Sequence, residues 1–161
     1  MNTQFKEDYE NLQLHILRTF SASQERVWDA WTRPELICQW WAPRPWTCEV
    51  ASMDFSEGGT WLYAMCGPEG EKHWGAMVYQ KINPKSRIEA KDAFCDENGK
   101  VNKEMPGSSM VIEFRAVSEN ETEVLVVSSF ESIEAMKQLV EMGAKEGFAM
   151  AQDQLEEILQ R

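Results

Sequence analysis

The strongest constraint on the fold is a segment that holds four of the seven tryptophans, Trp28, Trp31, Trp40 and Trp41, within fourteen residues. A proline disfavours helical geometry in the residue before it but fits the first turn of a helix, and Pro34 follows Arg33 inside this segment. The pattern therefore predicts two short helices that meet at an angle near Arg33. We call residues 27–43 the tryptophan wedge, and because indole rings bury large apolar areas, we expect it to cover a large apolar surface.

The length of 161 residues fits one domain, residues 1–161. Apolar residues make up 43% of the chain and aromatic residues 11%, which is enough for a substantial core. Residues 1–14 are mostly polar, and we interpret them as an N-terminal extension before the first strand.

The net charge of −11 excludes two classes of partner. Nucleic acids and anionic membrane surfaces both attract basic proteins, so neither is expected to bind. The first residues lack the apolar core of a secretory signal, and no apolar run is long enough to span a bilayer. These features predict a cytoplasmic protein whose partners are small molecules or basic protein surfaces.

The cysteines carry no metal-binding pattern. Cys38, Cys48, Cys66 and Cys95 are widely spaced, with no CxxC pair and no histidine cluster nearby. We expect free thiols in a reducing compartment, no metal and no cofactor. His15 and His73 are the only histidines, and nothing in the sequence places either beside a cysteine, so no catalytic residue is assigned.

Alternating apolar residues and turn signals predict a meander of antiparallel strands. The first strand is expected at residues 15–20, before the tryptophan wedge. Six more are expected at residues 46–54, 60–66, 73–82, 87–94, 108–117 and 122–130.

The last thirty residues predict one long helix, because apolar side chains recur at three- and four-residue spacing. Gly143 and Gly147 lie inside this pattern. Each glycine costs a helix about 1 kcal/mol relative to alanine. Since the two lie on one side of the helix, they favour either close approach to a sheet or a hollow beneath the helix.

Several segments together resemble the START-like (helix-grip, SRPBCC) superfamily, in the branch similar to the C-terminal domain of the activator of Hsp90 ATPase. They include Trp40-Trp41-Ala42-Pro43, Gly58-Gly59-Thr60-Trp61, Met65-Cys66-Gly67-Pro68-Glu69-Gly70 and Met142-Gly143-Ala144-Lys145-Glu146-Gly147-Phe148. The resemblance implies an α+β fold. A curved antiparallel sheet would have two short helices after the first strand and a long C-terminal helix over an apolar cavity.

In many proteins of this superfamily the cavity holds an apolar small molecule. The usual helix has a leucine where this chain has Gln152 or Gln154, a departure that would place an amide over the cavity.

Strand alternation and the resemblance together nominate residues that line such a cavity. Residues of one strand that share a face, such as Trp61, Tyr63 and Met65, point the same way. Any one of these aromatics could instead fill the core. The full candidate set is Trp41, Trp61, Tyr63, Met65, Tyr79, Asp92, Phe94, Ile112, Phe114, Gly143, Gly147 and Phe148.

Asp92 is the one carboxylate flanked by apolar residues on its own strand face. An ionised group inside a protein needs a partner, so Asp92 is a candidate ligand anchor or acid. The alternative is an ion pair with Arg18, Arg87 or Arg115, or a position open to water.

Three functions stay open from the sequence. The first is a non-catalytic module that binds an apolar or amphipathic small molecule. The second is a protein-interaction module of the Hsp90 co-chaperone type, which would bring a chaperone partner. The third is a cyclase-like or hydrolytic enzyme, which requires Asp92, His73 and Tyr63 to converge on one ligand position. Tryptophans exposed on the wedge would also suit a homodimer interface.

Overall fold

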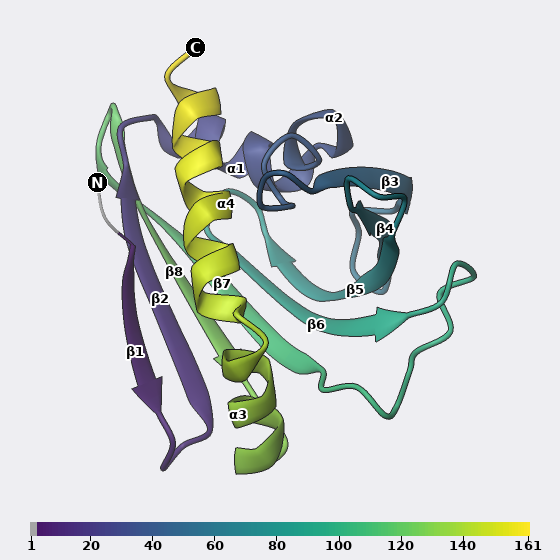
Figure 1. Ribbon diagram of the computed structural model, residues 1–161. Helices are drawn as coiled ribbons and strands as arrows, with labels where there is room; N and C mark the ends of the chain where they lie inside the picture. Colours follow the sequence, from purple (N-terminus) through teal and green to yellow (C-terminus); the bar gives the residue numbers. More distant parts are fainter. Residues whose placement is uncertain (1–2) are drawn as a thin grey trace.

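The computed structural model describes residues 3–161. Within them, one antiparallel sheet has the strand order β1-β2-β8-β7-β6-β5-β4-β3 (Figure 1). The strands are β1 (Gln4–Asp8), β2 (Gln13–Phe20), β3 (Thr47–Met53), β4 (Thr60–Cys66), β5 (Lys72–Asn83), β6 (Arg87–Cys95), β7 (Ser108–Ser118) and β8 (Glu121–Ser129). The helices are α1 (Gln24–Thr32), α2 (Pro34–Ile37), α3 (Ile133–Glu141) and α4 (Ala144–Leu159).

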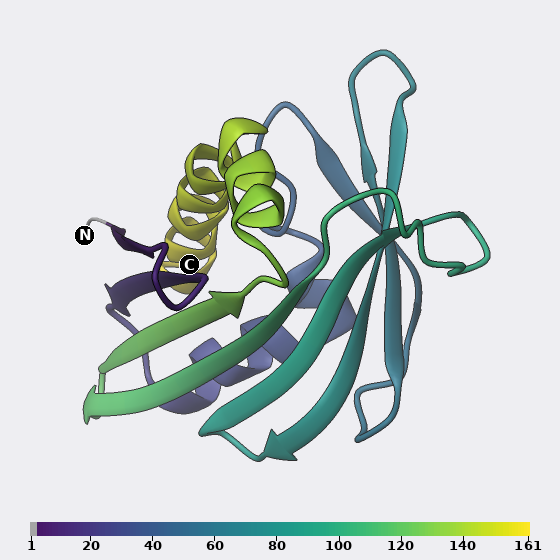
Figure 2. The ribbon, with the colours of Figure 1, turned by 90° about the horizontal axis from the view of Figure 1, so that it is seen from below.

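The structure confirms the predicted α+β helix-grip arrangement. The sheet is curved, and α4 lies across its concave side (Figure 2). Strands β3 to β8 follow the predicted meander, and β2 pairs with β8, so that the first predicted strand joins the last. No helix in the described part of the chain is long and apolar enough to cross a membrane.

The polar N-terminal segment forms a strand, although the sequence predicted an extension outside the sheet. Within the expected extension, β1 pairs with β2 in antiparallel register, from Gln4 opposite Leu17 to Asp8 opposite Gln13. A strand at the edge of a sheet tolerates exposed polar and charged side chains, which explains why β1 has no apolar alternation in its sequence.

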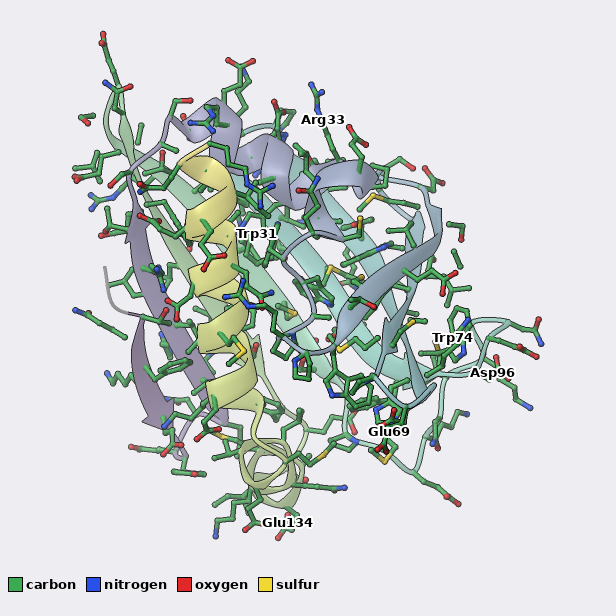
Figure 3. All side chains as sticks on the ribbon, turned by 45° about the horizontal axis from the view of Figure 1, so that its top comes forward. Trp31, Arg33, Glu69, Trp74, Asp96 and Glu134 are labelled. Atoms are coloured by element: carbon green, nitrogen blue, oxygen red, sulfur yellow. The ribbon has the colours of Figure 1, made fainter. Side chains whose placement is uncertain are left out.

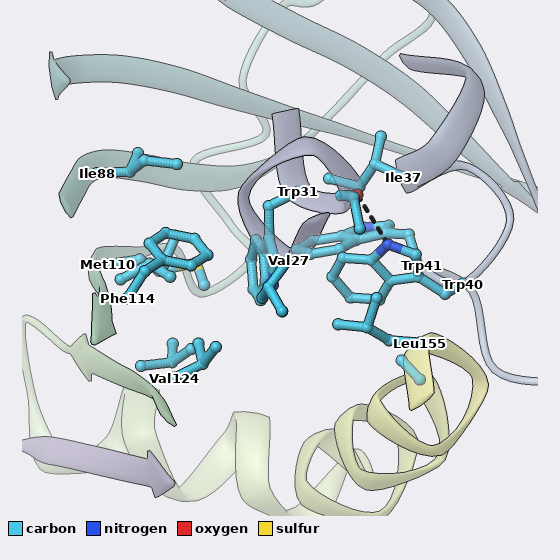
Figure 4. Packing of buried hydrophobic residues seen from close by; sticks show 14 of the residues in the cluster. Val27, Trp31, Ile37, Trp40, Trp41, Ile88, Met110, Phe114, Val124 and Leu155 are labelled. Atoms are coloured by element: carbon cyan, nitrogen blue, oxygen red, sulfur yellow. Dashed lines mark hydrogen bonds between the residues drawn. The ribbon is translucent and has the colours of Figure 1, made fainter. Parts of the chain in front are cut away.

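The tryptophan wedge forms the two short helices that the sequence predicts. Ser23 caps α1 by accepting a hydrogen bond from the Arg26 N–H at 3.3 Å. Arg33 is extended (φ −100°, ψ 128°) and separates α1 from α2, which begins at Pro34. The indole of Trp40 donates to the Ala30 carbonyl at 2.9 Å and fixes the two helices against each other (Figure 4).

The prediction of one continuous C-terminal helix is wrong, because the structure has two helices that are separated at Gly143. This residue has φ +89°, a left-handed conformation that glycine adopts without steric cost. It ends α3 and starts α4 in a new direction. Gly143 is therefore a hinge between two helices, whereas Gly147 lies inside α4 as expected.

The indoles of the wedge pack against aromatic residues of the sheet. Trp28 packs edge-on against Phe114 with ring centroids 5.1 Å apart, and Trp41 packs against Trp61 at 5.1 Å. Figure 3 shows Trp31 inside the molecule, whereas Arg33, Asp96 and Glu134 lie at its periphery. All four wedge tryptophans are buried. The homodimer interface was predicted on exposed wedge tryptophans, and this basis for it is removed.

Candidate functional site

A cavity of about 320 Å³ lies between the sheet and the junction of α3 with α4. Strands β4, β5 and β6 form its floor, and the two helices with the end of the wedge form its roof. Its described lining residues are Trp41, Pro43, Tyr63, Met65, His73, Trp74, Gly75, Asp92, Ala93, Phe94, Pro106, Ser108, Leu139, Met142, Gly143, Ala144, Gly147 and Phe148.

Two thirds of the residues nominated from the sequence come together at this cavity. Those that line it are Trp41, Tyr63, Met65, Asp92, Phe94, Gly143, Gly147 and Phe148. The other four, Trp61, Tyr79, Ile112 and Phe114, are buried in the core instead. They lie on the expected sheet face, but the wedge and neighbouring aromatics fill that part of it. Phe55, for example, packs edge-on against Tyr79 at 4.8 Å.

Leu139 and Met142 of the roof and the loop residue Pro106 also line the cavity, and no sequence pattern predicted them. Their positions depend on how α3 turns at Gly143 and on how the loop before β7 folds back. Strand alternation predicts neither of these features. Gly75 was also missed, although a glycine inside a strand is a signal for the close approach of another group.

Trp41 separates the cavity from the core. Its ring meets Trp61 on the core side, Tyr63 at 5.9 Å, and Phe148 of α4 at 6.5 Å. Edge-to-face packing of this kind is favourable beyond simple area burial, by about 0.5–1.5 kcal/mol for each pair. Trp41 is therefore held from three sides and forms a fixed wall of the cavity.

Tyr63 and Asp92 form the polar contact on the cavity floor. The Tyr63 hydroxyl donates a hydrogen bond to Asp92 Oδ1 at 3.1 Å. Gly75, the cross-strand partner of Tyr63, makes room for the ring, since a Cβ atom at Gly75 would lie 2.5 Å from the Tyr63 hydroxyl.

Asp92 forms no ion pair within residues 3–161, so the alternative of a pairing with Arg18, Arg87 or Arg115 is wrong. Arg18 instead contacts Asp153 at 2.6 Å. Arg87 contacts Glu89 and Glu113, and Arg115 contacts Glu123.

Burial raises the pKa of Asp92 from 3.8 to about 6, although the Tyr63 hydroxyl and the Ala93 backbone N–H act in the opposite direction. Asp92 is thus a partly buried carboxylate that is mostly ionised at neutral pH.

Tyr63 is a neutral donor at this site. Burial and the neighbouring Asp92 charge raise its pKa well above 10. The hydroxyl of Tyr79, by contrast, is buried in the core with no hydrogen-bond partner in the described structure. Of the two tyrosines considered, only Tyr63 presents its ring to the cavity.

His73 is exposed at the start of β5 and also lines the cavity. It packs against Trp46 with ring centroids 5.1 Å apart. Asp92, His73 and Tyr63 therefore border the same cavity, and only Tyr63 and Asp92 share a hydrogen bond. Within residues 3–161, no three His, Cys, Asp or Glu side chains are placed to hold a metal ion.

Neither glutamine of α4 lines this cavity, contrary to the expectation of an amide above it. Gln154 donates to the carbonyl oxygens of Trp40 (3.0 Å) and Ala42 (2.8 Å) and accepts from the Arg44 N–H (2.9 Å). It thereby fastens the end of the wedge to α4. Gln152 is also buried, and its Nε2 has no partner in the described structure.

The curved sheet, the wedge and the helix over an apolar cavity define the helix-grip class of proteins. The model of the family described as activator of Hsp90 ATPase homolog 1-like protein matches residues 21–160, and the chain belongs to this family. A search among curated proteins found no match.

Two solved structures show the same fold at moderate identity. A protein from Arthrobacter aurescens is 32% identical, with a TM-score of 0.92 and coverage of 98% of this chain and 91% of that one. A protein from Mycobacterium smegmatis is 30% identical, with a TM-score of 0.90 and coverage of 99% and 97%. An AHSA1 protein from Silicibacter pomeroyi shares the fold at 15% identity, with a TM-score of 0.72 and coverage of 91% and 96%.

Proposed function

We propose that this protein binds an apolar or amphipathic small molecule in the cavity beneath the α3–α4 junction, without catalysis. The observation that supports this most is a pocket of about 320 Å³ whose lining is mostly apolar and aromatic. Engineered apolar cavities of about 150 Å³ already bind benzene. A space twice as large is ample for a ligand of about ten non-hydrogen atoms, at roughly 30 Å³ for each.

The roof of the cavity supports the proposal, because the missing side chain of Gly147 leaves space there. Gly147 has only Pro43 Cγ near the position of a Cβ atom, at 3.7 Å, so packing alone does not require a glycine. A side chain at this position would extend into the cavity. Glycine inside α4 thus costs helix stability and keeps the cavity open.

Native mass spectrometry of gently purified protein tests the proposal, with 1-octanol added as a defined probe. We expect one molecule bound to each chain, either retained from the cell or taken up as octanol. Gly147→Leu, which fills the cavity, should abolish this binding. Met150→Leu changes an exposed residue of the same helix and should preserve it. A folded wild-type protein that takes up neither molecule contradicts the proposal.

Family membership favours a chaperone partner as the second candidate function. The matched family is described by the activation of the Hsp90 ATPase, so the corresponding test is the ATPase rate of purified Hsp90 with and without this protein. Stimulation that survives Gly147→Leu would place the interaction on the outer surface and separate it from ligand binding. An enzyme that uses Asp92, His73 and Tyr63 predicts instead that the retained molecule is chemically altered.

A further inference from the structure

The charge inside the cavity distinguishes between classes of ligand. Asp92 is the one carboxylate among the described lining residues, and no lysine or arginine lines the cavity with it. Lys91, its neighbour in β6, is exposed. The remaining polar lining groups are the Tyr63 hydroxyl, His73, Ser108 and the indoles of Trp41 and Trp74.

Asp92 keeps acceptor capacity for a ligand, because its two carboxylate oxygens carry about four lone-pair sites. Oδ1 accepts the hydrogen bond of Tyr63, and the Ala93 backbone N–H also stabilises the carboxylate. No side chain within residues 3–161 donates a hydrogen bond to Oδ2 or forms an ion pair with Asp92. A partly buried carboxylate without a cationic partner is costly, and a ligand that supplies the missing cation removes that cost.

The walls around Asp92 suit a cation as well. Trp41, Tyr63, Phe94 and Phe148 line the cavity, and so does Trp74, whose ring already carries Lys72 Nζ at 5.8 Å from its centroid. Faces of aromatic rings attract ammonium groups, and the attraction strengthens where water is excluded. A ligand carboxylate would meet only repulsion from Asp92, and the net charge of −11 disfavours its approach.

We infer that the cavity selects amphipathic amines: the apolar part of the ligand occupies the space under the α3–α4 junction, and its ammonium group binds Oδ2 of Asp92. This inference rests on the proposed binding function and specifies its ligand class. It disfavours fatty acids and other apolar anions, because their carboxylate would meet the charge of Asp92.

Three probes with the same eight-carbon chain test the inference, namely octylamine, 1-octanol and octanoic acid. Isothermal titration calorimetry at about pH 8 keeps the amine protonated and both octanoic acid and Asp92 ionised. Salt at about 0.15 M screens nonspecific attraction of the amine to the acidic surface. We expect octylamine to bind about ten- to a hundredfold more tightly than octanol, and octanoate to bind most weakly.

Asp92→Asn should abolish the preference for the amine while leaving octanol binding within about threefold of wild type. Glu119→Gln removes one charge from an exposed turn and should leave the preference intact. Equal binding of octylamine and octanol to the wild type, or a preference that survives Asp92→Asn, would overturn the inference while the proposed function stands. Failure of all three probes to bind would overturn the proposed function itself.

Discussion

The ring of Tyr63 lies directly over Gly75 on the neighbouring strand, so close that a Cβ atom at Gly75 would lie 2.5 Å from the Tyr63 hydroxyl oxygen and Cζ. The absence of a side chain on β5 thus determines where the hydroxyl of β4 meets the carboxylate of β6. The hydrogen bond to Asp92 depends on a glycine that takes no direct part in it.

We expect Gly75→Ala to displace Tyr63 and to lower the free energy of unfolding by about 1–3 kcal/mol, the usual cost of overpacking. Urea unfolding measures this change. In a Tyr63→Leu background the same substitution should cost far less, because the smaller side chain leaves room for the methyl group. An equal cost in both backgrounds would show that the two residues are not coupled.

Asp92 should make stability depend on pH in the direction opposite to that of a salt-bridged aspartate. Its folded-state pKa is raised from 3.8 to about 6, so the folded protein binds more protons than the unfolded chain between these values. The contribution of protonated Asp92 to the free energy of unfolding is fully present below pH 3.8 and is lost as the pH rises through about 6. Tyr63 of β4, His73 of β5 and Cys95 of β6 are the titratable groups nearby.

Asp92→Asn removes this pH dependence. Relative to wild type, the variant should gain about 1–2 kcal/mol of stability between about pH 4 and pH 7, after allowance for the partial exposure of the carboxyl group. Denaturant melts at several pH values measure the difference. A stability difference that stays constant across this range would contradict the assignment of a raised pKa to Asp92.

Most of the fold could be predicted because it is encoded locally. Pro34 after Arg33 predicts the break between α1 and α2, and turn residues mark the ends of β3 to β8. β1 escaped prediction because an edge strand needs no apolar alternation. The division at Gly143 escaped as well, since the apolar spacing continues across it and only the left-handed backbone reveals the break.

The sequence predicted which side chains share a strand face, but it did not predict which of them line the cavity. Alternation and the family resemblance together nominated Tyr63 and Asp92, which line the cavity, and they nominated Ile112 and Phe114 equally. Only three-dimensional packing shows that Trp28 covers Phe114 and leaves no space beside it.

The two glycines at the roof should respond to alanine with opposite signs. Gly143→Ala forces a left-handed backbone on an L-residue and should destabilise the protein by about 1–2 kcal/mol. Gly147→Ala meets no atom closer than 3.7 Å and should stabilise α4 by up to about 1 kcal/mol. Thermal melts of both variants check this. The same sign for both would show that the two glycines do not differ in role.

The two buried glutamines of α4 make a similar contrast. Gln154→Leu removes three hydrogen bonds to the end of the wedge and leaves two carbonyl groups without that partner, so we expect a loss of about 2–4 kcal/mol. Gln152→Leu replaces an amide whose Nε2 lacks a partner and should be neutral or stabilising. Urea unfolding followed by tryptophan fluorescence measures both, and equal losses would contradict this account of Gln154.

The most direct test of the central claim is a titration of ¹⁵N-labelled protein with 1-octanol, followed through the backbone amide signals of the glycines. Gly75, Gly143 and Gly147 line the cavity, whereas Gly58, Gly70 and Gly99 lie outside its lining. We expect saturable shifts of the first three signals and little change in the others. Shifts spread over both groups, or no shift at saturating octanol, would contradict a ligand-binding cavity beneath the α3–α4 junction.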